Sequence, residues 1–457
     1  MAADAVRYVA PLAWVGGAWA RDVLLEVGED GRWSGVTPNA PAQLRSGAAL
    51  LDGPVLPGLV NAHSHAFQRA IAGLTESSGA GEDDFWRWRD RMYSAANRIT
   101  PEQLEAIAAY LYAELVQAGY TEVCEFQYLH NGADGKAYAE PAEMSLALAR
   151  AARTAGIGLT LLPTLYMRSG FGASGLRPDQ QRFASTPESV LRTGATIDRL
   201  RDPLVHSGVA LHSLRAVDHA ALTEVAAAAR GRMPVHIHIA EQQQEVADCI
   251  AHHGRRPVEW LLEHVALDAR WNLVHATQTT SSELAGVQEK GASIVICPST
   301  EANLGDGVFD LPDWLARAGS WSIGSDSHVT RSWQEELRLL EYSQRLALRQ
   351  RNIAAGFGQR ESTAAVLFEG ALAGGSAAAG RALGGLKAGE RADFMVVDQD
   401  SPALLGVPDA HVLDALVFST PHAGVRQVHV AGRPVRPLAA QPDLARAMRV
   451  AMQALWP

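Results

Sequence analysis

The sequence predicts an α/β fold: a (β/α)8 barrel of the TIM type, with a small β-sandwich domain formed by both chain termini. Two observations predict it. Through the middle of the chain, short apolar runs alternate with segments of helical periodicity. Near both ends, short β-type runs flanked by turn residues replace this alternation. Apolar strands that alternate with helices are typical of a closed parallel barrel, because both faces of such strands are buried.

The predicted barrel strands share a nearly continuous apolar character. They cover residues 55–62, 120–126, 158–165, 208–214, 234–240, 271–276, 292–297 and 321–324. A doubly wound open sheet is the structural alternative. No glycine-rich phosphate loop follows the first strand, so the usual reason to prefer that fold is missing.

Helical patterns lie between these strands. One covers residues 101–118, where Thr100 is a suitable cap and Pro101 occupies the first turn. Another follows Asp218, which can cap the alanine-rich run to Arg230.

The chain of 457 residues is long enough for the barrel and a terminal domain together. We expect residues 55–383 to form the barrel and residues 1–54 and 384–457 to form the β domain. Neither end has enough chain for a stable sheet by itself, so the two ends are expected to pair with each other.

Composition is typical of a globular protein, with 47% hydrophobic and 20% charged residues. No apolar stretch reaches the roughly 18 residues that span a bilayer, and the N-terminus lacks the pattern of a signal peptide. Cys124, Cys249 and Cys297 are widely separated and odd in number, which argues against a disulfide framework. A net charge of -10 without a basic stripe argues against nucleic acid. We therefore expect a cytoplasmic protein that binds neither membrane nor nucleic acid.

Two histidines end the first predicted barrel strand. His63 and His65 are two residues apart, so their side chains leave the same face of a strand and can converge on one ion. Neutral imidazole is the commonest protein ligand for metals near pH 7. Alone, the pair is a weak indication, because the chain contains 16 histidines.

Polar residues also follow most of the other predicted strands. In a parallel barrel, functional groups gather at the C-terminal ends of the strands. Those ends carry, in chain order, His63, His65, Glu125, Tyr128, His212, Arg215, His238, Glu241, His275, Asp326 and His328. A barrel stabilised by packing alone would not place histidine or carboxylate at so many strand ends.

Three histidines and one aspartate suit a single divalent ion with an open position for water. The predicted ligands are His63, His65, His238 and Asp326. His236 shares a strand face with His238, so the ligand from this strand stays open. We favour His238 because it is nearer the strand end. Asp326 could instead cap a helix.

Several of these motifs resemble the amidohydrolase superfamily. They are residues 55–65, 238–241, 274–276 and 324–328, and residues 389–394 resemble the closing β domain of the same superfamily. Within it, residues 65–70, 85–89, 236–242 and 299–307 are similar to formimidoylglutamate deiminases. The resemblance covers nearly the whole chain and implies a metal-dependent hydrolase.

The resemblance implies hydrolysis of N-formimidoyl-L-glutamate to N-formyl-L-glutamate and ammonia, a step of histidine degradation. Zinc would acidify a water molecule, and Asp326 would accept its proton. Glu241 would move a proton to the imino nitrogen, and His275 would stabilise the tetrahedral adduct. The substrate is a small dicarboxylate, and the residues expected to bind it are Gln68, Arg89, Tyr128, His212 and Arg215.

One zinc ion per subunit is expected, with Fe2+ or Mn2+ as alternatives. Two-metal members of the superfamily bridge their ions with a carboxylated lysine at the end of the fourth strand. Here residues 212–215 end that strand, and the lysines of the chain are Lys136, Lys290 and Lys387. Glu125 is the other residue that could bridge a second ion. The expected assembly is a homodimer.

Two other functions stay open. A deaminase of an aromatic base (guanine, cytosine or an adenosine derivative) would use the same mononuclear zinc chemistry, but it would need stacking and amide groups rather than two arginines. A non-catalytic barrel scaffold should have lost ligands, whereas the expected positions are all filled. By glycine content, residues 79–84 and 170–175 are candidates for a loop that closes over the substrate.

Overall fold

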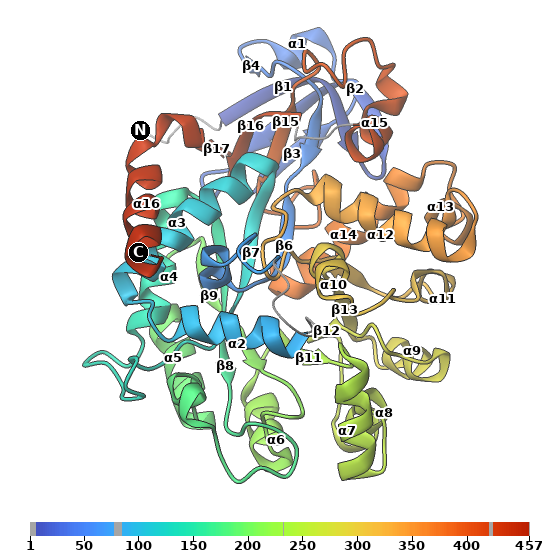
Figure 1. Ribbon diagram of the computed structural model, residues 1–457. Coiled ribbons are helices and arrows are strands. Elements are labelled where there is room, and N and C mark those ends of the chain that lie inside the picture. The colour runs from blue at the N-terminus through green and yellow to red at the C-terminus, as the bar shows by residue number, and fades with distance from the viewer. Residues whose placement is uncertain (1–5, 77–84, 232, 420–423, 457) are drawn as a thin grey trace.

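A nearly closed parallel barrel forms the centre of the molecule (Figure 1). The computed structural model describes residues 6–76, 85–231, 233–419 and 424–456. Within them, eight parallel strands follow one another around the barrel in chain order. They are β6 (Leu59–Ser64), β7 (Tyr120–Gln127), β8 (Gly158–Leu165), β10 (Val209–Leu211), β11 (Val235–Ile239), β12 (Trp271–His275), β13 (Ser293–Ile296) and β14 (Trp321–Ile323). The predicted barrel fold is confirmed.

The barrel closes between its first and last strands. β14 lies against β6, and a single parallel bridge joins Ser64 to Asp326 just beyond the end of β14. Side chains complete this seam: Asn61 Nδ2 donates to Ser325 Oγ over 2.7 Å, and Ser325 N donates to Asn61 Oδ1 over 2.9 Å. A short additional strand, β9 (Val205–Ser207), pairs with β8.

The strand predicted over residues 55–62 is divided in two. β5 (Val55–Pro57) pairs with β1 and β15 in the terminal sheet, whereas β6 starts at Leu59 in the barrel. Between them, a Cβ atom on Gly58 would lie 2.3 Å from the side chain of Thr121. The chain therefore passes from one sheet to the other at a position with no room for a side chain, and the barrel begins after the expected residue 55.

Both termini pair into a second sheet, as expected. Its strands are β1 (Val6–Val15), β2 (Ala18–Val27), β3 (Trp33–Thr37), β4 (Ala49–Leu50), β5, β15 (Phe394–Val397), β16 (Val425–Val430) and β17 (Arg433–Pro434). Hydrogen bonds connect these strands into one sheet. The long β1 lies inside it and pairs with β2 along one edge and with β4 and β5 along the other. This sheet has its own core, which includes Trp33 and Phe394.

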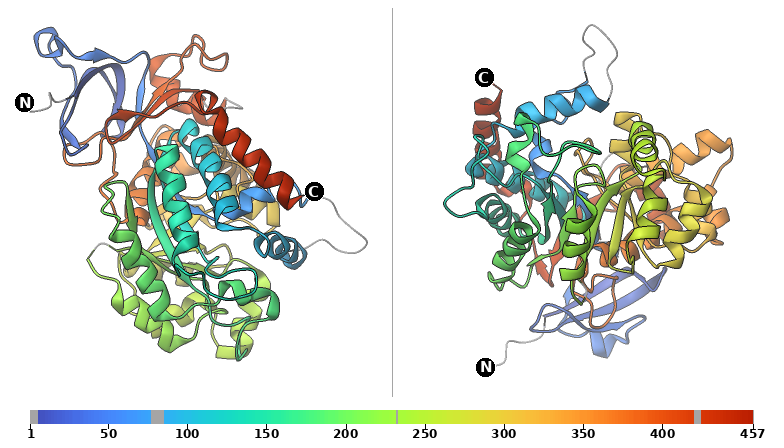
Figure 2. Two further views of the ribbon diagram at one scale, coloured as in Figure 1. Left: turned by 90° about the vertical axis from the view of Figure 1, so that its left-hand side faces the viewer. Right: turned by 90° about the horizontal axis from the view of Figure 1, so that it is seen from below.

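Most of the helices surround the barrel, and the first short helix lies beside the terminal sheet (Figures 1 and 2). They are α1 (Ala42–Arg45), α2 (Phe85–Ala96), α3 (Pro101–Ala118), α4 (Glu143–Ala155), α5 (Pro187–Asp198), α6 (His219–Ala228), α7 (Gln243–His253), α8 (Pro257–His264), α9 (Ser281–Glu289), α10 (Pro298–Leu304), α11 (Leu311–Ala316), α12 (Trp333–Leu348), α13 (Ile353–Phe357), α14 (Thr363–Ala379), α15 (Val412–Phe418) and α16 (Pro442–Leu455). Short 3-10 helices cover Ala66–Ala70, Pro178–Phe183, Asp409–His411 and Leu438–Ala440.

Capping residues set the helix starts that the sequence predicts. Thr100 accepts a hydrogen bond from Gln103 N and completes a capping box at the start of α3. Asp218 caps α6 through Ala221 N over 2.9 Å. The C-terminal helix α16 lies outside both sheets and packs against α3.

A buried arginine joins the terminal sheet to the barrel. Arg391 is 5% exposed, and its Nη1 donates to Glu122 Oε2 on β7 over 2.8 Å. Its Nη2 donates to Asp393 Oδ2 over 2.6 Å and to the carbonyl oxygen of Thr121 over 3.0 Å. One guanidinium therefore satisfies acceptors of both sheets.

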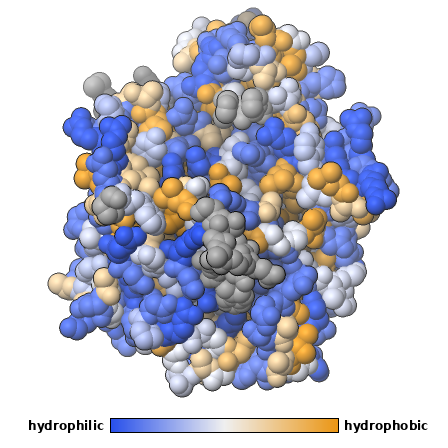
Figure 3. Space-filling model, viewed as in Figure 1, coloured by the Kyte–Doolittle hydropathy of each residue, from blue (hydrophilic) through white to orange (hydrophobic). Residues whose placement is uncertain are grey.

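Hydrophobic and hydrophilic residues are interspersed on the face shown in Figure 3. Across the described ranges, no helix has the length and apolar character needed to cross a membrane.

Candidate active site

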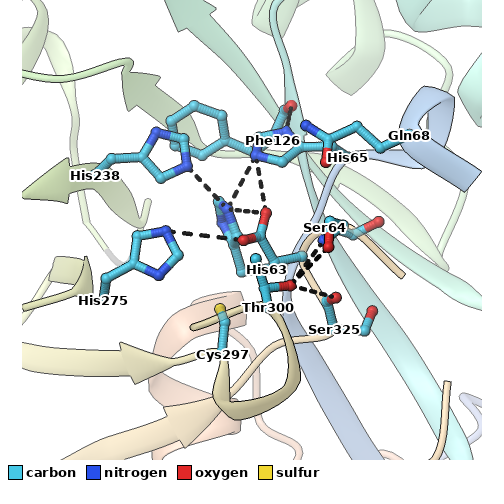
Figure 4. A network of polar contacts seen from close by, with 12 residues as sticks. His63, Ser64, His65, Gln68, Phe126, His238, His275, Cys297, Thr300 and Ser325 are labelled. Atoms are coloured by element: carbon cyan, nitrogen blue, oxygen red, sulfur yellow. Dashed lines mark hydrogen bonds and ion pairs between the residues drawn. The ribbon is translucent and has the colours of Figure 1, made fainter. Parts of the chain in front are cut away.

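The predicted metal ligands meet at the C-terminal ends of the barrel strands (Figure 4). His63 Nε2 lies 3.1 Å from His65 Nε2 and 3.0 Å from His238 Nε2. Asp326 Oδ1 lies 3.4 Å from His63 Nε2 and 3.3 Å from His65 Nε2. All four side chains are buried. The structure therefore brings together residues from β6 and the position that follows it, from β11, and from the segment after β14.

Backbone carbonyl groups orient two of these rings. His65 Nδ1 lies 3.0 Å from the carbonyl oxygen of Phe126, and His238 Nδ1 lies 2.9 Å from that of His212. A carbonyl oxygen only accepts hydrogen bonds, so each Nδ1 carries the hydrogen. Each Nε2 therefore keeps its lone pair directed at the cluster, as in histidines that ligate metals.

Burial lowers the pKa of His63 to about 3, lowers the pKa of His65, and lowers the pKa of His238 well below its ordinary value, which favours their neutral forms. Burial would raise the pKa of Asp326, but the hydrogen bond with His63 and the nearby His65 outweigh it and hold that pKa well below its usual range. A cation placed among the three Nε2 atoms and Asp326 Oδ1 would accept a lone pair from each of them. This donor set, completed by one carboxylate, fits a single divalent metal ion.

Glu241 and His275 lie beside this cluster. Both Glu241 Oε1 and Asp326 Oδ2 lie 3.8 Å from His275 Nε2. Burial raises the pKa of Glu241 to about 7, although the charge of His275 opposes this shift. A carboxyl group that titrates near neutrality can both give and accept a proton. Burial would lower the pKa of His275, but Glu241 and hydrogen bonds outweigh it and raise that pKa well above its ordinary value.

Glu301 holds the other nitrogen of His275 and was not predicted as a site residue. His275 Nδ1 lies 3.3 Å from Glu301 Oε1, and the same oxygen accepts a hydrogen bond from Cys297 N over 2.8 Å. Glu301 belongs to α10, which follows β13 directly. The sequence did contain a signal for this residue. Glu301 lies in the motif 299–307, just after the seventh predicted strand, and no site residue was predicted at the end of that strand.

The predicted substrate-binding residues line one pocket together with the metal cluster. At one end it is lined by His65, His238, Glu241, His275 and Asp326. The rest of its wall includes Gln68, Arg89, Tyr128, His212, Arg215, Tyr93, Tyr166 and Arg168. The structure thus gathers every residue that the sequence analysis predicts for catalysis and substrate binding.

Hydrogen bonds and ring contacts fix several of these residues. Gln68 Nε2 donates to the Tyr128 hydroxyl over 3.4 Å, while Gln68 Oε1 is buried without a partner among the described residues. The His212 ring packs against Tyr166, with centroids 4.3 Å apart. The guanidinium of Arg168 donates to the carbonyl oxygens of Leu214, Arg215 and Val217 over 2.8 to 3.2 Å. Arg168 therefore holds the loop that carries Arg215.

Two alternatives from the sequence lie outside the metal cluster. His236 Nε2 lies 2.9 Å from the carbonyl oxygen of Ala378, so this ring bonds to α14 instead. Glu125 accepts hydrogen bonds from Ser64 Oγ and Ala66 N, both over 2.6 Å, and from the Tyr112 hydroxyl over 3.0 Å. These bonds occupy both carboxylate oxygens of Glu125, and they place it behind the metal cluster rather than in position to bridge a second ion.

Two other predicted features can be placed relative to the pocket. His328 Nε2 lies 3.2 Å from Ser64 Oγ, so His328 extends the network behind the cluster. Phe171, in the candidate loop 170–175, packs against His252 and His253 of α7. The other candidate loop, residues 79–84, lies outside the described residues.

A parallel barrel with three histidines and an aspartate at its strand ends is the arrangement of a metal-dependent hydrolase. The model of the amidohydrolase family matches residues 55–435, and the chain belongs to that family. One relative is a formimidoylglutamate deiminase from Pseudomonas aeruginosa. It is 49% identical over 419 residues, which cover 91% of each chain.

Other relatives are more distant. A 5-methylthioadenosine/S-adenosylhomocysteine deaminase from Halobacterium salinarum is 29% identical over 356 residues, covering 78% of this chain and 75% of that protein. Among solved structures, an amidohydrolase from Brucella melitensis has a TM-score of 0.91 and 41% identity, covering 99% and 100% of the two chains. A zinc-bound adenosine deaminase from Xanthomonas campestris has a TM-score of 0.79 over 98% of both chains, and its 24% identity shows the fold alone.

Proposed function

We propose that this protein hydrolyses the imino C–N bond of N-formimidoyl-L-glutamate and releases N-formyl-L-glutamate and ammonia, as a step of histidine degradation. One observation carries the proposal: a single pocket brings Arg89 and Arg215 together with the metal donor set. A linear amidine with two carboxylates complements this pocket, with the amidine at the metal donors and the carboxylates at the arginines. The relative that is 49% identical bears the name of this activity.

We propose that His63, His65, His238 and Asp326 hold one zinc ion, for which Fe2+ or Mn2+ could substitute. Nitrogen and carboxylate donors are acceptable to each of these metals. When bound, such an ion supplies a Lewis acid and lowers the pKa of a coordinated water molecule.

The residues beside the donor set move the protons. Asp326, which is anionic, accepts a proton from the attacking water. Glu241 gives a proton to the terminal nitrogen of the amidine, and the proton taken up by Asp326 follows it, so that this nitrogen leaves as ammonia when its bond to carbon breaks. The hydroxyl proton left on the carbon-bound oxygen returns to Glu241 as the formyl C=O forms. The raised pKa of Glu241, about 7, suits a group that must both bind and release a proton. His275, whose raised pKa favours the charged form, stabilises the negative charge that develops on the attacking oxygen.

The residues of the pocket wall that lie outside the metal cluster recognise the substrate. Arg89 and Arg215 supply positive charge for the dicarboxylate, since guanidinium groups pair well with carboxylates. Gln68, Tyr128 and His212 supply neutral polar groups nearer the metal cluster, where Tyr128 and His65 have ring centroids 5.2 Å apart. An uncharged aromatic base would make no use of this positive charge, so this wall favours the diacid over a nucleobase.

An ammonia-release assay tests the proposal. The purified protein, with its metal content measured, is offered N-formimidoyl-L-glutamate, N-formimidoyl-L-aspartate, guanine, cytosine and 5-methylthioadenosine. We expect N-formimidoyl-L-glutamate to have the highest kcat/KM. Faster release from any of the three bases would instead support an aromatic-base deaminase. Absence of turnover on all substrates by metal-loaded protein would support a non-catalytic scaffold.

A further inference from the structure

We propose that Tyr93 and Tyr166 act together as a hydroxyl donor for the substrate carboxylate that lies farther from the amidine. The inference rests on the proposed function and adds two specificity-determining residues to it. Both side chains line the pocket, and each is only 5% exposed. They come from α2 and from the residue that follows β8.

Their position favours the distal carboxylate. The centroid of the Tyr128 ring lies 5.2 Å from that of His65 in the metal cluster. The Tyr166 ring instead contacts the rings of Tyr128, Phe183 and His212, and among the described residues it contacts no ring of the metal cluster. The guanidinium carbon of Arg89 lies 5.6 Å from the centre of the Tyr93 ring. The two phenols are therefore beside a cation, at the end of the pocket away from the reacting carbon.

The buried Gln180 determines the direction of the hydrogen bonds among its own side chain and the two phenols. Gln180 Oε1 accepts a hydrogen bond from Arg177 N over 3.1 Å, which fixes the orientation of its amide. Gln180 Nε2 must then face the phenols, and it donates to the Tyr93 oxygen over 3.2 Å and to the Tyr166 oxygen over 3.1 Å. Both hydrogens of this amide nitrogen are used in this way.

One of the two phenol hydroxyl groups still has a hydrogen to donate. The two phenol oxygens lie 3.3 Å apart, so one hydroxyl can donate to the other. The second hydroxyl hydrogen has no further acceptor among the described residues, since the remaining neighbour, Gln180 Nε2, is itself a donor. Burial raises the pKa of Tyr166 well above its ordinary value, so this phenol keeps its proton near pH 7.

A spare donor in a buried, cationic wall discriminates between ligands. A carboxylate oxygen accepts a strong, charge-assisted hydrogen bond from it. A methyl group in the same place would leave the hydroxyl without a partner, and sites built to pair with a polar group reject analogues that lack it. The phenol pair therefore adds selectivity for an anionic chain end to the attraction supplied by Arg89 and Arg215.

The test uses Tyr93→Phe, Tyr166→Phe and the double variant, with Tyr110→Phe on α3 as a matched control outside the pocket. Two substrates are compared: N-formimidoyl-L-glutamate and N-formimidoyl-L-norvaline, in which a methyl group replaces the distal carboxylate. We expect the double variant to lose about tenfold or more in kcat/KM for the diacid and far less for the norvaline derivative. Each single variant should lose less than the double, because the remaining hydroxyl can still donate.

Equal losses on both substrates, or none on the diacid, would overturn the inference while leaving the proposed function intact. Calorimetric binding of glutarate separates the two questions further. If wild-type protein does not hydrolyse the diacid but binds glutarate, and the double variant binds it about tenfold more weakly, the proposed function fails and the phenol pair stands. If the double variant binds glutarate as wild type does, or neither protein binds it, the inference fails.

Discussion

His275 Nδ1 lies 3.3 Å from Glu301 Oε1, and this contact joins the end of β12 to the helix that follows β13. The same carboxylate oxygen accepts the amide hydrogen of Cys297, so Glu301 is itself held in place. A carboxylate accepts hydrogen bonds and does not donate them when ionised. The contact therefore keeps a hydrogen on Nδ1 and directs Nε2 toward Glu241 and Asp326.

The first prediction concerns this positioning role. Glu301→Gln should lower kcat by about 10- to 100-fold, the range typical of groups that orient a functional histidine, while KM changes little. The reason is that an amide holds the charged imidazole less firmly than a carboxylate does. Steady-state kinetics measure both constants, and Glu289→Gln, exposed at the end of α9, is the control. An unchanged kcat, or a rise in KM of the same size, would contradict the assignment.

The second prediction separates the two histidines of β11. His238→Ala should leave the purified protein almost without metal, because it removes a donor 3.0 Å from His63 Nε2. His236→Ala should retain metal near one equivalent, since that ring bonds to Ala378 instead. Elemental analysis of both variants gives the answer. Loss of metal from the His236 variant alone would reverse the choice of ligand.

The third prediction concerns proton transfer by Glu241. Glu241→Gln should keep its metal but lose about 10²- to 10⁴-fold in kcat, because an amide cannot relay a proton. Metal content and turnover are measured on the same preparation. A rate near that of wild type would show that another group supplies the proton.

The fourth prediction concerns recognition of the diacid. Arg215→Met keeps much of the side-chain volume and removes the charge, so KM for N-formimidoyl-L-glutamate should rise about 10- to 100-fold. The exposed Arg230→Met is the matched control. An unchanged KM would mean that the carboxylates bind elsewhere in the pocket.

Part of the active site could be predicted from the sequence, because a parallel barrel brings the C-terminal ends of all its strands to one face. Once residues are assigned to strand ends, the fold itself brings His63, His238 and Asp326 together. Tyr93 and Gln180 could not be found in this way, because α2 and the 3-10 helix Pro178–Phe183 lie outside the strand ends of the barrel. Only the tertiary contact between these segments shows that their side chains meet.

The boundary between the two sheets could not be predicted from the sequence for another reason. Residues 55–62 are apolar throughout because β5 and β6 are both buried, although in different sheets. Hydrophobicity alone cannot divide such a run. The division at Gly58 depends on its close approach to Thr121, which is a contact between distant parts of the chain.

The last prediction concerns the arginine that joins the terminal sheet to the barrel. Arg391→Met should lower the free energy of unfolding by about 3 to 5 kcal/mol, because it removes the guanidinium that pairs with the buried carboxylates of Glu122 and Asp393. Urea denaturation of metal-loaded protein measures the change, and Arg192→Met, which removes an exposed ion pair with Glu188, should have little effect. A similar, small loss in both variants would show that the two sheets do not depend on this contact. Because Arg391 lies away from the pocket, the Arg391 variant that remains folded should keep the KM of wild type, and a change in KM would contradict this view of a purely structural contact.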